Sequence, residues 1–203
     1  MASQSRFSEK RLKLTMVYTA QFLDTEFYPE SPIPRIDINP FSRGAKKRQR
    51  VLICKHDEPV TLLYIYVEVD DDGYLLEQCF RECLLNENKI ALLYGQHVHL
   101  FDTVSYEVKS LYLHDYVGHL YPLPAISSRV LSNTFLVTTF LYTFLINVDS
   151  GIIWQSKQCA IDGVVIDDVQ DNVIYGSGEW DPPGGWEPFR LSLSTGHFID
   201  ETK

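Results

Sequence analysis

The chain has 203 residues, of which 45% are apolar and 13% aromatic, and its net charge is −9. This composition predicts one folded domain with a sizeable core and excludes disorder for most of the chain. The negative charge disfavours nucleic acid as a direct partner, because phosphates would be repelled, and it suits a basic protein partner.

Three sequence features predict a cytoplasmic protein. The longest apolar run, 135–148, is interrupted by threonines and an asparagine, so no membrane-spanning segment is expected. The basic N-terminus lacks an apolar stretch followed by a small-residue cleavage site, so no signal peptide is predicted. The four cysteines are scattered, which favours reduced thiols, and no metal or other cofactor is expected.

Residues 1–50 are predicted to be extended and irregular, apart from a mixed apolar stretch at 14–23 that suits a first strand. Prolines at 29, 32, 34 and 40 remove backbone donors and disfavour helix, which is typical of a connector. The run RGAKKRQR at 43–50 is predicted to be a solvated basic loop. We expect the whole segment to cover an edge of the domain that follows.

From residue 51 onward the chain is rich in strand signals. Short apolar stretches at 51–55 and 61–69 carry β-branched and aromatic residues, and a turn with three aspartates and a glycine follows at 70–73. The segment 74–85 fits the helical period, yet it also suits a strand because everything after it is β. The repeat described next favours the strand.

The second half of the chain contains an internal repeat. Asn88, Asn133 and Asn172 stand 45 and 39 residues apart, and each precedes three short strands separated by turns. The predicted strands are 90–94, 97–101 and 107–113, then 135–139, 142–148 and 152–155, then 173–175, 189–193 and 197–199. This period is typical of β-propeller blades.

The chain holds about four such units, too few for a closed ring of six or seven. We therefore predict an all-β fold of antiparallel, blade-like repeats that form a small or incomplete β-propeller, or a half-barrel of curved sheets. Residues 51–203 are predicted to form this single β-repeat domain.

The loop at 178–188 has the most unusual composition, with two tryptophans, three carboxylates and three prolines. Tryptophan is enriched in binding hot spots, and carboxylates pair with arginine or lysine of a partner. The predicted contact residues are Glu179, Trp180, Asp181, Trp186 and Glu187. The alternative is a structural lid in which the tryptophans fold onto the core.

Two further acidic groups are candidates for steering a basic partner. They are Asp70, Asp71 and Asp72 in one turn and Asp167 and Asp168 in a later segment. Such charges raise the association rate more than the affinity. The alternative is that they are ordinary solvated turn residues.

The sequence gives no positive sign of an enzyme. It contains neither a Gly-x-Ser-x-Gly elbow nor a phosphate-binding glycine-rich loop. His97 and His99 would lie on one face of a strand and could bind a metal if His114, Asp115 or His119 supplied a third ligand. Structural histidines are the preferred interpretation, so we expect no catalytic residues and no metal site.

Three motifs carry a resemblance to known proteins. They are GSGEWDPPGGWEPFRLSLSTG at 176–196, IDGVVI at 161–166 and VGHLY at 117–121. Together they resemble a family of small cytosolic bacterial proteins without an enzymatic assignment, over roughly residues 85–200. Proteins of this size and type also resemble immunity proteins of contact-dependent inhibition and related toxin systems.

The resemblance implies that the protein binds a delivered toxin domain, often a basic nuclease, and blocks its active site. The expected function is therefore an immunity-type, non-enzymatic neutraliser of a basic toxin, with no direct contact to nucleic acid or membrane. The alternative is a propeller-like module that binds a carbohydrate or another small ligand, with tryptophans stacked on sugar rings.

Overall fold

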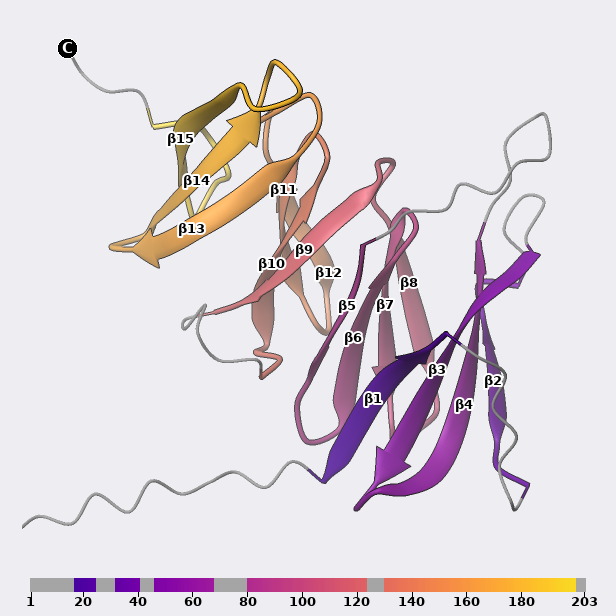
Figure 1. Ribbon diagram of the computed structural model, residues 1–203. Helices are drawn as coiled ribbons and strands as arrows, with labels where there is room; N and C mark the ends of the chain where they lie inside the picture. Colours follow the sequence, from indigo (N-terminus) through magenta and orange to yellow (C-terminus); the bar gives the residue numbers. More distant parts are fainter. Residues whose placement is uncertain (1–16, 25–31, 41–45, 68–79, 124–129, 200–203) are drawn as a thin grey trace, which may run out of the picture.

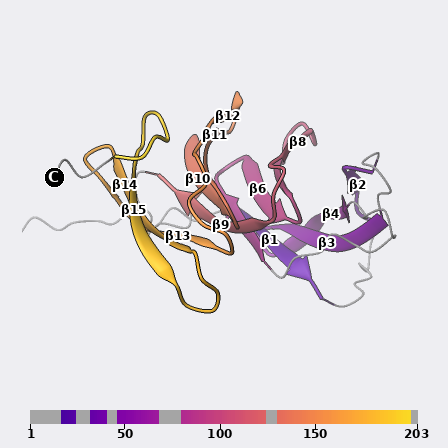
Figure 2. The ribbon, with the colours of Figure 1, turned by 90° about the horizontal axis from the view of Figure 1, so that it is seen from above.

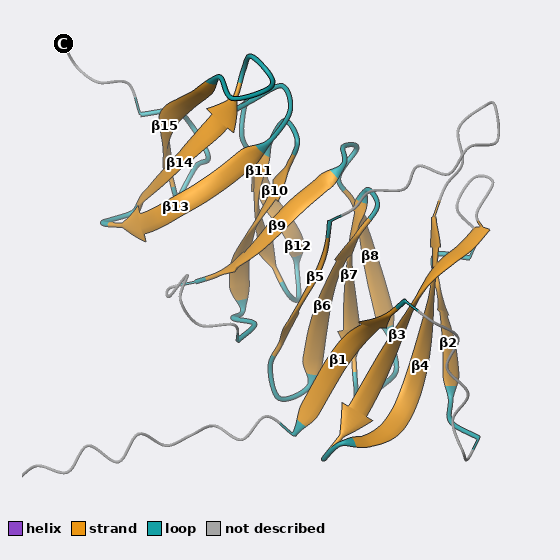
Figure 3. Ribbon diagram, viewed as in Figure 1, coloured by secondary structure: helices purple, strands orange, loops and turns teal. Residues whose placement is uncertain are grey.

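The computed structural model describes residues 17–24, 32–40, 46–67, 80–123 and 130–199. Every regular element within these ranges is a β-strand (Figure 3), which confirms the all-β prediction. The strands form four small sheets that follow one another in chain order (Figures 1 and 2), and none of the sheets closes on itself. A membrane-spanning helix is absent from the described residues.

The first sheet has the strand order β1-β3-β4-β2. Its strands are β1 (Tyr18–Leu23), β2 (Arg35–Ile38), β3 (Lys46–Lys55) and β4 (Glu58–Val67). Strand β1 confirms the strand expected within 14–23, whereas the prediction of an irregular segment is wrong at β2 and at 46–50, where the end of the expected basic loop belongs to β3. Whether 51–203 forms a separate domain stays a prediction.

Strand β2 forms between prolines because its four residues alternate strictly. Ile36 and Ile38 face the core, whereas Arg35 and Asp37 share the opposite face. The strand pairs in parallel with β4 and lies at the edge of the sheet, where nearby proline is tolerated. The short apolar alternation thus outweighs the proline signal.

The second and third sheets are four-stranded antiparallel meanders, and the fourth has three strands. The second comprises β5 (Arg81–Leu85), β6 (Lys89–Tyr94), β7 (His97–Asp102) and β8 (Val108–Tyr112). The third comprises β9 (Val117–Pro122), β10 (Thr134–Thr139), β11 (Thr143–Asn147) and β12 (Gly151–Gln155). The fourth comprises β13 (Val164–Gln170), β14 (Val173–Glu179) and β15 (Trp186–Ser192).

These sheets confirm the predicted strands of the repeat and show a further strand before each unit, of which β9 and β13 were not predicted. The strand alternative is confirmed for 81–85, whereas 74–79 lies outside the described residues. The last predicted strand, 197–199, is reduced to a bridge between Leu191 and Phe198 with a bond from Ile199 N to Arg190 O.

Asparagine and aspartate set the turns of the repeat. Asn86 Oδ1 accepts hydrogen bonds from the amides of the β5–β6 turn, and Asp102 Oδ1 does the same in the β7–β8 turn. Asn147 Oδ1 accepts from two amides of the β11–β12 turn. Such side chains replace a backbone turn bond, which fixes where each strand ends and the next begins.

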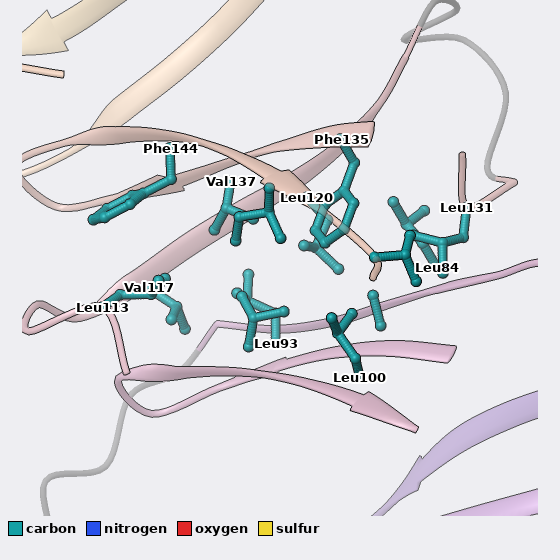
Figure 4. Close-up of a cluster of buried hydrophobic side chains, with 14 residues drawn as sticks. Leu84, Leu93, Leu100, Leu113, Val117, Leu120, Leu131, Phe135, Val137 and Phe144 are labelled. Atoms are coloured by element: carbon teal, nitrogen blue, oxygen red, sulfur yellow. The ribbon is translucent and has the colours of Figure 1, made fainter. Parts of the chain in front are cut away.

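Apolar side chains fill the space between each pair of neighbouring sheets. Figure 4 shows Leu93 and Leu100 of the second sheet pointing toward Val137 and Phe135 of the third. A separate cluster lies between the first and second sheets, and another between the third and fourth. The two middle sheets are thus buried on both faces, which explains the nearly continuous apolar run of β6.

The first strands of successive sheets lie beside one another, in the order β1, β5, β9, β13. A side chain joins each neighbouring pair. Cys83 Sγ donates to Ala20 O at 3.6 Å, Leu120 N donates to Glu82 Oε2 at 2.8 Å, and Ile166 N donates to Tyr121 Oη at 3.1 Å. We call this line of contacts the seam.

Glu82→Ala tests the seam. The substitution removes the acceptor of the Leu120 amide and the partner of His119, so the free energy of unfolding should fall by about 1–2 kcal/mol in urea titrations. Glu87→Ala is the matched control, since Glu87 lies exposed in the β5–β6 turn. Equal stability of the two variants would show that the carboxylate of Glu82 contributes nothing to the stacking of the sheets.

Candidate partner-binding site

The loop between β14 and β15 is closed by its own hydrogen bonds. Trp180 N donates to Gly185 O at 2.8 Å, and Gly185 N donates to Asp181 O at 3.0 Å. Glu179 Oε1 accepts from Gly184 N at 2.6 Å, which braces the loop from within. Gly184 has a φ of 106°, a conformation that other residues rarely adopt. The loop is thus held in one shape, and part of its acidic charge serves that purpose.

A pocket of about 650 Å³ lies along β14 and β15, beside the end of the chain segment at 198–199. This volume falls in the range of ligand-sized sites. Aromatic side chains and charged groups share the lining. The lining residues used below are Asp167, Tyr175, Trp180, Glu187, Arg190 and Phe198.

The structure brings three of the predicted residues together at this pocket, namely Asp167, Trp180 and Glu187. Trp180 is 39% exposed, so its indole is available to a partner. Trp186 is exposed as well, and its indole lies over Gly163, with 3.4 Å between Cη2 and the position of an added Cβ.

The remaining predicted residues take other places. Asp181 is exposed in the loop, and the carboxylate of Asp168 accepts a hydrogen bond from Val169 N at 2.8 Å. Asp70, Asp71 and Asp72 lie outside the described residues. The lid alternative stays a prediction, because both tryptophans are exposed although the Trp186 ring lies against Gly163 of its own chain.

Sequence reasoning missed Tyr175, Phe189, Arg190 and Phe198 as pocket residues. Strand alternation in β14 gives one available signal. Ile174 is buried with Gly176 and Gly178 on its face, so Tyr175 must lie on the other face, where it is exposed. Phe189 and Phe198 carried no such signal, because their rings meet at 6.1 Å only once the chain turns back after β15.

Exposed apolar side chains gather at this end of the molecule. Of the eleven large apolar residues that are exposed within the described residues, five lie on the fourth sheet, in its β14–β15 loop or in the segment after β15, namely Tyr175, Trp180, Trp186, Phe198 and Ile199. None of the eleven lies in the first sheet. Contiguous exposed apolar surface marks interaction sites more often than chance scatter does. The fourth sheet is therefore the open end of the array.

The same end is strongly acidic. Between 161 and 199 the sequence has seven carboxylates and one arginine, and no lysine. The carboxylates are Asp162, Asp167, Asp168, Asp171, Glu179, Asp181 and Glu187. Aromatic anchors ringed by negative charge suit a basic surface, since the charges would steer it and the aromatics would hold it.

The free edge of β15 is unsuited to pairing with a strand of a partner. Arg190 O accepts from Ile199 N, and Ser192 N donates to His197 O. The even-numbered residues of β15 therefore direct their backbone N–H and C=O groups toward this edge. The next such residue is Pro188, which has no N–H, and the amide of Trp186 already donates to Gly184 O. Recognition at this site would use side chains.

The two strand histidines do lie on one face, as predicted. Their rings stack at 5.4 Å, with His97 Nε2 3.3 Å from Asn39 Nδ2 and His99 Nδ1 2.9 Å from Ser110 Oγ. Burial lowers the pKa of His97 to about 4 and that of His99 to about 3. Within the described ranges, no group of three His, Cys, Asp or Glu side chains could hold a metal ion.

The chain matches no protein-family model and no curated protein sequence. The function proposed below therefore depends on the geometry and charge of the fourth sheet.

Proposed function

We propose that this protein binds a basic protein through its fourth sheet and blocks it, as immunity proteins block a delivered toxin such as a nuclease. The observation that supports the proposal is the coincidence of exposed aromatic side chains and carboxylates at one end of the array. The protein would act in the cytoplasm, without catalysis of its own.

The proposed mechanism has two steps. Carboxylates around the pocket, such as Asp167 and Glu187, attract the basic partner from a distance. Trp180 and Tyr175 then anchor a side chain of the partner in the pocket. The bulk of the bound protein would cover the catalytic cleft of the partner, so inhibition needs no chemical step.

We further propose that the four sheets follow the geometry of an incomplete propeller, in which the fourth sheet is the end that receives another surface. Both faces of the middle sheets are already covered by neighbours. The first sheet shows no exposed large apolar side chain among its described residues, whereas the fourth shows several. An added partner would therefore bury the open end.

Trp180→Ala should weaken partner binding by about 30-fold or more, because a buried tryptophan anchor typically contributes 2 kcal/mol or more. The partner is first captured on the tagged protein from its native cell at low and moderate salt, then purified for titration calorimetry. Ile153→Ala is the control, since Ile153 is also exposed but lies on β12. Unchanged affinity of the Trp180 variant, with the partner still bound, would contradict the proposed site.

A carbohydrate or other small ligand is the second candidate. It is favoured by one observation, the combination of Trp180 and Tyr175 with Asp167 and Arg190 in a pocket of about 650 Å³. Glycans titrated into the protein would then shift the indole resonance of Trp180 without any protein present. Such shifts, together with no captured protein at either salt concentration, would replace the first proposal by this one.

A further inference from the structure

Two histidine sites lie at two successive interfaces between sheets. His97 and His99 project from β7 on the same face as Phe101, which belongs to the core between the first and second sheets. Asn39, which follows β2 of the first sheet, meets His97 at 3.3 Å. The interface is thus apolar at one end and lined by imidazoles at the other.

In the described part of the chain, the groups around these imidazoles include none that would neutralise a positive charge. From β8 they meet Ser110 and Tyr112, and the Tyr112 ring stacks on His97 at 5.0 Å. The nearby ionisable groups are themselves histidines: His114 lowers the pKa of His97, and His97 lowers the pKa of His99. Both electrostatic effects oppose a positive charge on the ring. The neighbours on β6 on this face are Tyr94, opposite His97, and Leu92, opposite His99. Among the described residues, no carboxylate contacts either ring.

The sign of the pH response follows from this burial. The pKa of each histidine in the folded protein is lower than the ordinary value, so the unfolded or opened form binds more protons. The stacking of the first two sheets is therefore strongest above the ordinary histidine pKa and weakens as the pH falls toward 4.

The seam between the second and third sheets responds in the opposite direction. His119 Nδ1 of β9 lies 2.6 Å from Glu82 Oε1 of β5, and this bond raises the pKa of His119. Phe80 contacts the same ring, Tyr121 lies beside it on β9, and Asp167 of β13 is the next carboxylate along the seam. The charged pair contributes stability at low pH and loses it as the pH rises through the raised pKa of His119.

We propose that acid releases the first sheet from the second while the second, third and fourth sheets stay stacked. Protonation of His97 and His99 disfavours the interface between the first and second sheets, whereas protonation of His119 favours the interface between the second and third. Acid therefore acts on the two interfaces in opposite ways. The proposal is independent of the function proposed above. It describes a change in which the site on the fourth sheet is preserved.

Hydrogen exchange at pH 7.5 and pH 4.5, corrected for intrinsic rates, tests the proposal on the intact protein. Protection in β1, β3 and β4 should fall by about 70-fold, the change between these two pH values for one histidine whose pKa is lowered from 6.5 to about 4. Protection in β9 to β15 should change far less. Tryptophan emission should also stay constant, because Trp154 and Trp186 lie in the third and fourth sheets and Trp180 lies in the loop that joins β14 to β15.

Matched variants separate this inference from general acid unfolding. His97→Gln with His99→Asn keeps polar partners for Asn39 and Ser110 but cannot be protonated, so the acid response of the first sheet should vanish. His119→Gln should leave that response intact. Equal loss of protection over all four sheets of the wild-type protein, or no loss in the first, would overturn the proposal, even if the double variant fails to fold.

Discussion

Gly178→Ala is expected to lower the free energy of unfolding by about 3 kcal/mol or more, the upper end of overpacking effects. Gly178 lies on the inner face of β14, where the loop before β13 approaches closely. An added Cβ would overlap the carbonyl oxygen of Cys159 and lie 2.9 Å from the Ala160 side chain. Neither group can move away easily, because one is backbone and the other is fully buried. Urea unfolding followed by tryptophan emission measures the effect.

Ser177→Ala is the control for this prediction. Ser177 is the neighbour of Gly178 on β14 and projects from the opposite face, so its stability should change by less than about 0.5 kcal/mol. If Gly178→Ala were as stable as Ser177→Ala, the close approach of the loop to β14 would be wrong. The packing of the third sheet against the fourth would then need another explanation.

The repeat was predictable because its signals are local. Short apolar strands joined by Asn and Asp turns lie next to their partners in sequence, and each turn side chain bonds to amides two or three residues away. In the first sheet, β2 and its pairing were not predictable in this way. Strand β2 pairs in parallel with β4, so Arg35 meets Leu62 across a long connection that no local pattern indicates.

The part of the candidate site that lies in the β14–β15 loop was predictable, because the composition of this loop is unusual. Trp180 and Glu187 were recognised from the loop, and the structure places both at the pocket. The internal use of Glu179 was not predictable, because it depends on the position of Gly184 N after the loop has closed. Phe198 was missed because its neighbour Phe189 lies across a turn and on another strand. To predict which residues of separate strands line one pocket, the register of the sheet must be known, and the sequence alone does not give it.

For the histidines, too, one property was predictable from the sequence and another was not. Alternation predicted that His97 and His99 share a face, and they do. Their burial depends on the first sheet, which packs against that face. Because the sequence predicted strands at 51–55 and 61–69 without saying which face of which sheet they cover, it could not distinguish a metal-binding pair from an imidazole-lined interface.

Phe135→Ala is expected to lower the free energy of unfolding by about 3–5 kcal/mol, because it leaves a cavity in a closely packed core. Phe135 is fully buried on β10, between the second and third sheets, and points at the apolar residues of the second sheet (Figure 4). This is the middle interface of the array. Urea titrations followed by both circular dichroism and tryptophan emission measure the effect.

Phe198→Ala removes the same side chain at the open end and serves as the matched control. Phe198 is 38% exposed and lines the pocket, so the variant should lose less than about 1.5 kcal/mol of stability. If the fourth sheet is the binding surface, partner affinity should nevertheless fall in this stable variant. A stability loss as large as that of Phe135→Ala would instead assign Phe198 to the core, and the pocket would then be part of the fold rather than a surface open to a partner.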